Sequence, residues 1–331
     1  MHNGQPQTNH KTADRGLCRL LCMGLCYVFV PLLLSFSLYG NAAAAQLLIV
    51  ANTQQALHDR FATQIKQHLA SQHNDEISIR IIDTADWQAE TSNQHQLTLV
   101  LGTRAALAIS RHKLTSAILF SMVPAITYHQ TIATSTACET GRCSAVFIDQ
   151  PVTRTLALAH LALPQLKTAG LLSSHTSRAD IAQLKANAQK QGMHIRQQQA
   201  DDPENMIFKL TDILQHSDAL LALPDHGIYS RHTVQNILLT AYRYHKPVIG
   251  YSQAFVKAGA LFAVYSSPDQ LSQHTASVVA QFFANQAQQL PPPQHPRYFS
   301  VAVNRMVAKS LGIDIQTEIE LQKRLEALSN E

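Results

Sequence analysis

Apolar and polar positions of residues 46–149 follow a repeated strand-then-helix pattern. The continuous apolar run Leu47–Ala51 is typical of a strand covered on both faces. Apolar residues then recur at every fourth position, as on one face of a helix. These residues are Leu57, Phe61, Ile65 and Leu69. Further apolar runs predict strands at 77–82, 97–101, 117–120 and 144–148, and the threonine-rich stretch 127–136 predicts a loop or an edge strand.

The tripeptide Asp149-Gln150-Pro151 breaks this alternation, which then starts again. Pro151 suits the first turn of a helix. The second block predicts strands at 168–172, 193–197, 219–223, 247–250, 260–264 and 298–303, and its longest helix at 268–289. Two successive alternating blocks predict an α/β fold with two doubly wound, Rossmann-like lobes, each with a parallel sheet.

Residues 1–45 have the pattern of an export signal. A basic start ends at Arg19, an apolar run covers 20–38, and small residues at 41–45 favour cleavage before Gln46. The apolar run is also close to membrane-spanning length, so an uncleaved N-terminal anchor is the alternative.

Two cysteines, Cys138 and Cys143, remain after the expected cleavage. They bracket a turn-like Glu-Thr-Gly-Arg spacer, and an exported chain meets an oxidising compartment, so we expect a disulfide between them. Two free thiols are the alternative.

Composition and charge exclude several kinds of function. The chain has 331 residues with 46% hydrophobic and 15% charged, which is enough for two domains. Its net charge is +4, and no basic stripe is interleaved with aromatic residues, so we expect no nucleic-acid partner. The 17 histidines are scattered, with neither H-x-x-x-H nor C-x-x-C after residue 45, so we expect no metal site and no cofactor.

Motifs for catalysis are also missing from the sequence. It contains neither a G-x-S-x-G nucleophile elbow nor a phosphate-binding P-loop. Asp225-His226 is the nearest approach to a catalytic couple, but neighbours in sequence need not face each other in space. We therefore expect that the protein is not an enzyme and has no catalytic residue. The alternative is an α/β enzyme that uses Asp225 and His226.

The expected ligand site lies beyond the carboxyl ends of the strands, where open α/β sheets bind ligands. Hydroxyls and helix-start amides at these ends could hold a carboxylate. Asp225 could take a ligand ammonium, and Tyr251 or Phe255 could stack on an apolar or aromatic part of the ligand. The predicted ligand-binding residues are Thr53, Thr103, Arg104, Ser121, Ser174, Thr176, Asp225, Tyr251 and Ser252. The same residue types also favour helix caps and turns, which is the alternative for each of them.

Several segments resemble the substrate-binding proteins of one class of bacterial ABC importers. They are the Pro-Val-Ile-Gly segment within 246–264, the closing 301–313, the strand and Gly-Thr-Arg-Ala-Ala turn of 99–106, and 144–151. In this family the helix after the second crossing between the lobes often carries a Leu-Gly pair. The corresponding residues here are Leu271 and Ser272.

The resemblance implies a type I periplasmic-binding-protein fold whose lobes meet at a multi-segment hinge. The implied lobes are 46–149 plus about 264–290, and 150–263 plus about 296–331. It also implies a periplasmic protein that binds a small organic solute, such as an amino acid, without chemistry, and that docks on an ABC permease of the inner membrane. A periplasmic sensor or accessory module using the same clamp is the alternative function.

Overall fold

The computed structural model describes residues 1, 45–71, 77–175, 178–285 and 289–329. Apart from Met1 and Ala45, the expected export signal lies outside the described residues, as does Thr176, one of the predicted ligand-binding residues. Within the described ranges, no helix is both long and apolar enough to cross a membrane.

The first sheet, sheet A, is entirely parallel, with the strand order β2-β1-β3-β4-β5. Its strands are β1 (Ala45–Ala51), β2 (Ile77–Asp83), β3 (Leu97–Leu101), β4 (Ala117–Val123) and β5 (Cys143–Phe147). The strand predictions for this half of the chain are therefore confirmed to within a few residues.

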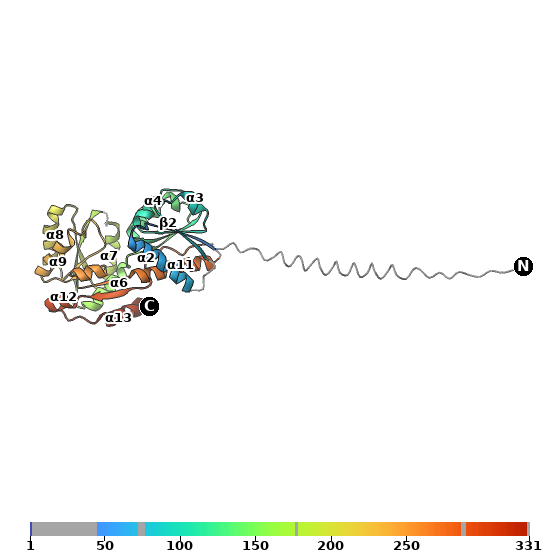
Figure 1. The fold of residues 1–331 in the computed structure, drawn as a ribbon. Coiled ribbons are helices and arrows are strands. Elements are labelled where there is room, and N and C mark those ends of the chain that lie inside the picture. Colours follow the sequence, from blue (N-terminus) through green and yellow to red (C-terminus); the bar gives the residue numbers. More distant parts are fainter. Residues whose placement is uncertain (2–44, 72–76, 176–177, 286–288, 330–331) are drawn as a thin grey trace. The chain divides into compact units, whose positions relative to one another are not determined.

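Helices cover both faces of sheet A, which explains the continuous apolar runs of its strands. On one face, Leu47 and Ile49 pack in a core with α2 (Ala56–Ser71) and α11 (Pro268–Ala284), which lie side by side in Figure 1. On the other face, Leu48 and Val50 pack with α4 (Thr103–Ile109). Because successive side chains of a strand point to opposite faces, both sets must be apolar.

The amphipathic pattern predicted for α2 is confirmed over most of its length. Phe61, Ile65 and Leu69 are buried, whereas Leu57 in the first turn is 48% exposed. A short helix, α3 (Ala89–Asn93), precedes β3.

The connection between β4 and β5 was predicted as a loop or an edge strand, and this prediction was wrong. It consists of the short helix α5 (Ala125–Thr127), the π-helical turn η2 (Tyr128–Ile132) and the 3₁₀ turn η3 (Thr136–Cys138). Tyr128 and Ile132 are buried in the core on the α4 side, and this burial outweighs the polar composition of the segment. The predicted disulfide is confirmed: Cys138 in η3 is bonded to Cys143 at the start of β5.

The second sheet, sheet B, has the order β11-β10-β9-β8-β6-β7. Its strands are β6 (Thr168–Ser173), β7 (His194–Gln199), β8 (Ala219–Leu221), β9 (Val248–Gly250), β10 (Phe262–Tyr265) and β11 (Ser300–Val303). All neighbours are parallel except β10 and β11, so the expectation of a purely parallel sheet was wrong for its last strand. The chain reaches β11 only after passing through α11 on sheet A, so no crossover helix on sheet B forces β11 to run parallel.

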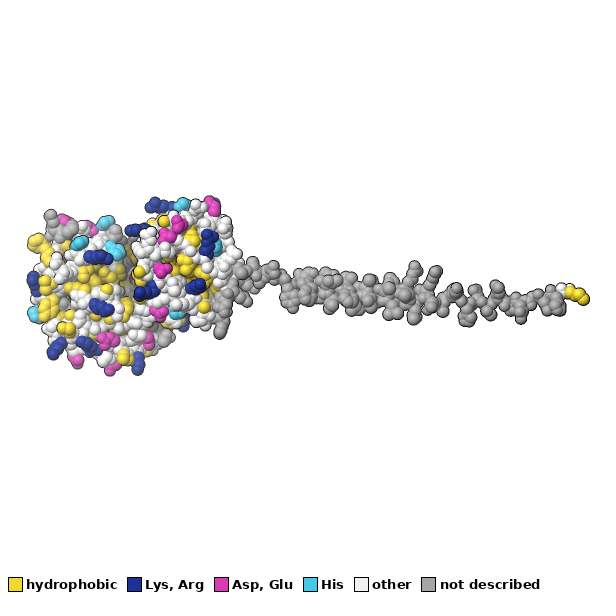
Figure 2. All heavy atoms as spheres, in the orientation of Figure 1, with side chains coloured by type: hydrophobic (Ala, Val, Ile, Leu, Met, Phe, Trp, Pro, Cys, Tyr) yellow, Lys and Arg dark blue, Asp and Glu magenta, His cyan; other side chains and the backbone are white. Residues whose placement is uncertain are grey.

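Sheet B is also covered on both faces. One core gathers Leu171, Phe262 and Val264 with α6, α7 and α13, and another gathers Leu172, Leu220 and Ala263 with α8, α9 and α10. The bounds are α6 (Val152–Ala162), α7 (Arg178–Lys190), α8 (Pro203–Gln215), α9 (Val234–Arg243), α10 (Gln253–Ala258), α12 (Arg305–Ser310) and α13 (Glu318–Ser329). On the face in Figure 2, the described Lys and Arg side chains are interspersed with Asp and Glu.

The chain passes between the two sheets three times, at 148–151, 266–267 and 294–299. The third of these crossing segments runs beside β5, because the Phe147 amide donates to the Gln294 carbonyl and the Gln294 amide donates to the Ala145 carbonyl. The predicted fold class, with two doubly wound lobes joined by a multi-segment hinge, is confirmed.

Candidate functional site

A cavity of about 280 Å³ is lined by residues of both lobes and of the crossing segments. From the side of sheet A it is lined by Pro124, Ala125, Ile126 and His129, and from the crossing segments by Asp149, Gln150 and His295. From the side of sheet B it is lined by Val152, Thr155, Gln183, Leu184, Ala222, Leu223, Pro224, Tyr251 and Val264. The wall therefore combines apolar side chains with a small number of polar groups, as is typical of small-molecule sites.

The sheet A wall is formed where β4 gives way to α5. The pairing of β4 with β5 is irregular here, and Met122 has a φ of 59°, which is uncommon for a residue other than glycine. The Asp149 side chain accepts a hydrogen bond of 2.8 Å from the Ala125 amide and so holds the start of α5. Strained backbone of this kind is often found at functional sites.

Two histidines that line the cavity pack on Phe147, and one of them, His295, also lies beside Asp149. The His129 and His295 rings pack edge-on against Phe147, with centroid distances of 5.4 and 5.1 Å. The Nδ1 atom of His295 is 2.9 Å from the Asp149 carbonyl oxygen and 3.7 Å from its Oδ2. Backbone and side chain of Asp149 thus tie the first crossing segment to both α5 and the third crossing segment.

A second group of hydrogen bonds joins all three crossing segments behind the cavity. Arg154 Nη1 donates to Gln150 Oε1 at 2.6 Å and to the Pro296 carbonyl at 3.0 Å. Gln150 Nε2 donates to Ser266 Oγ at 2.8 Å, and this hydroxyl donates to the Tyr298 carbonyl. Gln150 also lines the cavity, so a group bound there would contact a side chain that is part of the hinge.

Tyr251 is the aromatic side chain on the sheet B wall. Its ring packs on Phe255 at a centroid distance of 4.9 Å and lies 6.1 Å from Tyr229. Burial, and secondarily the negative charge of Asp225, raises the pKa of Tyr251. The phenol is therefore neutral across the physiological range and presents a π-face and one hydroxyl.

Asp225 lies behind this wall and does not line the cavity. It is 5% exposed, and its carboxylate accepts hydrogen bonds from the Ser174 amide and hydroxyl and from the Gly227 amide, at 2.8 to 2.9 Å. These bonds join the ends of β6 and β8. His226 is exposed, and the carboxylate of its sequence neighbour is directed at Ser174 and Gly227. The geometry thus gives no support to a catalytic couple of Asp225 and His226.

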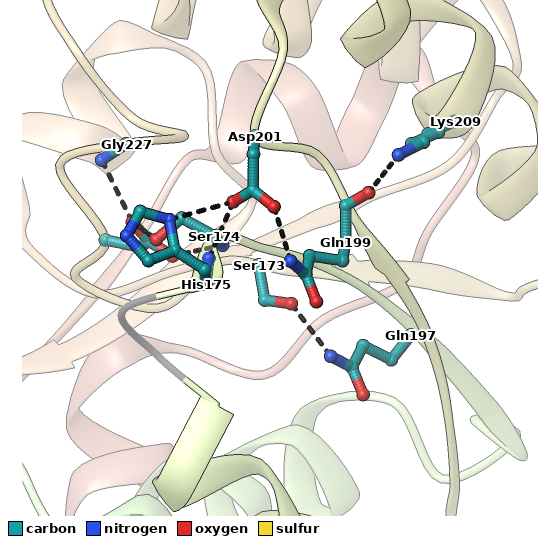
Figure 3. A network of polar contacts seen from close by, with 9 residues as sticks. Ser173, Ser174, His175, Gln197, Gln199, Asp201, Lys209 and Gly227 are labelled. Atoms are coloured by element: carbon teal, nitrogen blue, oxygen red, sulfur yellow. Dashed lines mark hydrogen bonds and ion pairs between the residues drawn. The ribbon is translucent and has the colours of Figure 1, made fainter.

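A further polar network fixes the ends of β6 and β7 (Figure 3). Asp201 accepts from the His175 amide at 2.7 Å and from Gln199 Nε2, and the Lys209 ammonium donates to the Gln199 carbonyl. The hydrogen bond from Gln199, and then that from the His175 amide, lowers the pKa of Asp201. This network holds two loops in place and is distinct from the residues that line the cavity.

Of the predicted ligand-binding residues that the structure describes, Tyr251 lines the cavity. Thr53 bonds Asp83 through its amide and hydroxyl, and Ser252 caps α10 by accepting from the Phe255 amide. Ser121 is fully buried, and its hydroxyl lies 2.9 Å from that of Thr275 in α11.

Thr103 and Arg104 form the first turn of α4, half-buried and exposed respectively. The ligand-binding role of the whole predicted set stays a prediction.

Sequence reasoning missed the residues that line the cavity from the crossing segments. Asp149 and Gln150 were noted as an interruption of the pattern and as part of the resembling segment 144–151, but not as ligand-binding residues, and His129 and His295 were not singled out. Within the described ranges, no group of three or more His, Cys, Asp or Glu residues could hold a metal ion.

Two parallel-sheet lobes joined by three crossing segments, with a cavity between them, define the class of two-lobed proteins with the type I periplasmic-binding fold. The chain belongs to the ABC transporter substrate binding protein family, whose model matches residues 43–324. Members of this family bind small molecules, work with a transporter permease, are typically exported and are generally not enzymes. No curated protein matches the chain.

Solved structures with similar folds include three transport-related proteins. An ABC domain from Streptococcus pneumoniae in complex with L-Trp is 18% identical, with a TM-score of 0.57, covering 85% of this chain and 98% of that one. The ligand-free, open CD0873 from Clostridium difficile, a substrate binding protein with adhesive properties, is 16% identical, with a TM-score of 0.64 and coverages of 82% and 96%. A periplasmic ribose ABC transporter from Conexibacter woesei is 13% identical, with a TM-score of 0.50 and coverages of 85% and 99%. At these identities the likeness shows the fold alone.

Proposed function

We propose that this chain is the exported solute-binding component of an ABC uptake system, and that it holds a small organic solute in the cavity without chemical change. The observation that carries the proposal is the lining of the cavity, which combines Ile126 near sheet A, Tyr251 near sheet B and Gln150 of the first crossing segment. A solute that contacts all three stabilises the arrangement in which they are close together. Binding then shifts the equilibrium between an open and a closed form of the protein, and the permease binds the closed form.

The lobes that close are proposed as 46–149 plus about 264–290, and 150–263 plus about 296–331. The packing of α11 on α2, and of α13 in the core of sheet B, supports this division. Because β10 (Phe262–Tyr265) pairs within sheet B, the second boundary is better placed near residue 266.

The size of the cavity limits the solute. At about 280 Å³ it lies just below the ~300–1,000 Å³ range of typical ligand sites, which favours a molecule of amino-acid size. Apolar side chains such as Leu184 and Val264 would cover the body of the solute, and Tyr251 would stack on it.

Export is the second part of the proposal. The pattern of residues 1–45 supports a cleaved signal and a periplasmic protein that docks on an inner-membrane permease. N-terminal sequencing of the exported protein tests this part: a start at or near Gln46 supports it, whereas an intact N-terminus favours the membrane-anchored sensor module instead.

A thermal-shift screen tests solute binding directly. The full chain is heated with amino acids, amines and small organic acids, including L-tryptophan because the similar protein from S. pneumoniae was solved with L-Trp. A solute at a hundredfold excess over its Kd adds about 2.7 kcal/mol of stability. Tyr251→Ala should remove the shift and the exposed Tyr242→Ala should keep it. A screen without any stabilising solute, together with a purified protein that carries no small molecule, would contradict the proposal.

A further inference from the structure

We propose that the protein has a second binding site, which takes a small carboxylate on an apolar body and pairs it with Arg154. The site is a groove between α6 and α13, which lie side by side against sheet B (Figure 1). This inference goes beyond the proposed function, because it does not depend on the solute of the cavity described above, which is called the inter-lobe cavity from here on.

The groove between α6 and α13 holds a cavity of about 530 Å³, which is within the ~300–1,000 Å³ range of typical ligand sites. Arg154, Thr153 and His160 line it from α6, and Leu325 and Leu328 line it from α13. None of the described residues lines both this groove and the inter-lobe cavity. The two cavities are therefore separate, and both can be occupied at once.

Arg154 carries a positive charge that no described carboxylate neutralises. The ion pairs among the described residues do not include it. Burial lowers the pKa of Arg154, which shows that its surroundings disfavour the charge. Because an arginine stays protonated in a protein, an anion that pairs with this guanidinium would be stabilising.

The guanidinium of Arg154 is held rigidly, with one edge left over. Nη1 donates to Gln150 Oε1 and to the Pro296 carbonyl, and the plane lies 4.3 Å from the centre of the Phe299 ring. Among the described residues, Nε is buried without a hydrogen-bond partner, and Nη2 donates to none of them.

This free edge determines the kind of ligand. Nε and Nη2 together form the edge that a carboxylate binds through two parallel hydrogen bonds. An unpaired buried donor is costly, so an acceptor that reaches this edge is favourable. Nη2 is the atom that a ligand in the groove would meet first, and Nη1 keeps its own two partners.

The rest of the lining fits an anion with an apolar body. Among the described residues that line the groove there is no Asp or Glu, and the exposed Thr153 and His160 can each donate a hydrogen bond. Leu325 is buried and Leu328 is 51% exposed, so together they offer apolar surface to the rest of the ligand. The single arginine of the lining matches a singly charged carboxylate.

Isothermal titration of the full chain at pH 7.5 and low salt tests the inference with one ring in three charge states. The probes are 4-phenylbutyrate (anion), 4-phenylbutanamide (neutral) and 4-phenylbutylamine (cation), with acetate as a carboxylate that lacks the apolar body. The titrations are made in the Ile126→Trp variant, which fills the inter-lobe cavity, and repeated in the wild type. Tyr251→Ala takes the place of Ile126→Trp if that variant does not fold.

In the Ile126→Trp variant we expect 4-phenylbutyrate to bind at one site. It should bind roughly tenfold tighter than the amide and the amine, because a hydrogen bond to a charged group is lost in both. It should also bind roughly tenfold tighter than acetate, which buries no apolar surface against the two leucines.

A charge placed in the groove locates the site. Leu328 is exposed at the end of α13, so Leu328→Asp and Leu328→Asn should both fold. Leu328→Asp should bind 4-phenylbutyrate roughly fivefold more weakly than Leu328→Asn, because its carboxylate repels the ligand at low salt. Ile319→Asp, at a 69% exposed position near the other end of α13 and outside the groove, is the matched control and should bind like the wild type. Arg154→Gln should abolish binding if it folds.

The remaining outcomes separate this inference from the proposed function. Butyrate binding that is seen in the wild type and lost in Ile126→Trp belongs to the inter-lobe cavity, so it overturns the inference and supports the proposed function. Equal binding to Leu328→Asp and Leu328→Asn, an amide or amine that binds as tightly as the acid, or no binding of the acid at all also overturns the inference. Binding that persists in Ile126→Trp and weakens in Leu328→Asp supports it, whatever the thermal-shift screen finds.

Discussion

Two aspartates, Asp225 behind the sheet B wall and Asp149 in the first crossing segment, look alike in the sequence and differ in the structure. Each follows the end of a strand and each accepts a backbone amide. Asp225 is 5% exposed and joins two loops through the Ser174 and Gly227 donors, whereas the Asp149 side chain is 20% exposed and lines the cavity. A carboxylate at a strand end can therefore be part of the scaffold or part of the site. What distinguishes the two roles is whether the side chain lines the cavity.

The largest expected effect is the loss of stability from removing the scaffold carboxylate. Asp225→Ala leaves the Ser174 and Gly227 donors without their acceptor, which should cost about 3 kcal/mol. Asp149→Ala, at the more exposed position, should cost about 1 kcal/mol. Urea unfolding of both variants measures the difference. A greater loss for Asp149→Ala than for Asp225→Ala would reverse the assignment of scaffold and site.

The disulfide belongs to the scaffold as well, because it fixes the segment that carries His129. The double variant Cys138→Ser/Cys143→Ser opens a loop with a sequence separation of 5, which should lower the free energy of unfolding by about 2 kcal/mol. Solute binding should be retained in the folded double variant, because neither sulfur lines the cavity. A folded variant that has lost binding would place the disulfide in the site rather than in the scaffold.

The free energy of unfolding should depend on pH through His274, which contacts the third crossing segment. His274 in α11 accepts the Arg297 amide at 3.2 Å, and its pKa is lowered, first by burial and then by the charge of Arg297. A group whose pKa is lower in the folded than in the unfolded state stabilises the fold above its unfolded pKa, here 6.5, and loses that contribution as the pH falls.

Urea unfolding between pH 7.5 and 5 tests this dependence. The wild type should lose stability more steeply on acidification than His274→Asn, while the exposed His160→Asn should follow the wild type. If the free energy of unfolding changes with pH equally in the wild type and in His274→Asn, the prediction is contradicted.

The smallest expected effect concerns Tyr251 of the sheet B wall and its neighbour Tyr229. Within the described residues, the buried Tyr229 hydroxyl has no hydrogen-bond partner, so Tyr229→Phe should leave the free energy of unfolding unchanged or raise it by up to about 1 kcal/mol. Tyr251→Phe should change it by less than about 0.5 kcal/mol. Thermal unfolding of both variants is the measurement, and a clear loss for Tyr229→Phe would show that its hydroxyl is bonded after all.

Much of the fold could be predicted from the sequence because strand burial leaves a local signal. Runs such as Leu47–Ala51 must be apolar on both faces, and a predicted break at Asp149-Gln150-Pro151 coincides with the first crossing segment. The reversed direction of β11 and the helical turns around Tyr128 depend on packing against segments far along the chain, and no local pattern contains that information.

The site was harder to predict for the same reason. The expectation that ligands bind beyond the carboxyl ends of the strands correctly placed Tyr251 at the cavity. The contact between Asp149 and His295, in contrast, joins residues that are 146 positions apart. These residues meet only because the third crossing segment runs beside β5. Polar residues at other strand ends instead hold the backbone in place: Thr53 bonds Asp83 at the end of the neighbouring strand β2. Ser252 caps α10, which is a role that short polar side chains favour.

Native mass spectrometry of the full chain, purified without denaturation, tests most directly whether the cavity holds a solute. The wild type is compared with Ile126→Trp, which fills the cavity, and with Ile207→Trp on the exposed surface of α8. We expect one small organic molecule to be released in near-stoichiometric amount from the wild type and from Ile207→Trp, and none from Ile126→Trp. Equal release from all three proteins, or release from none of them even after incubation with the solutes of the screen, would contradict the account.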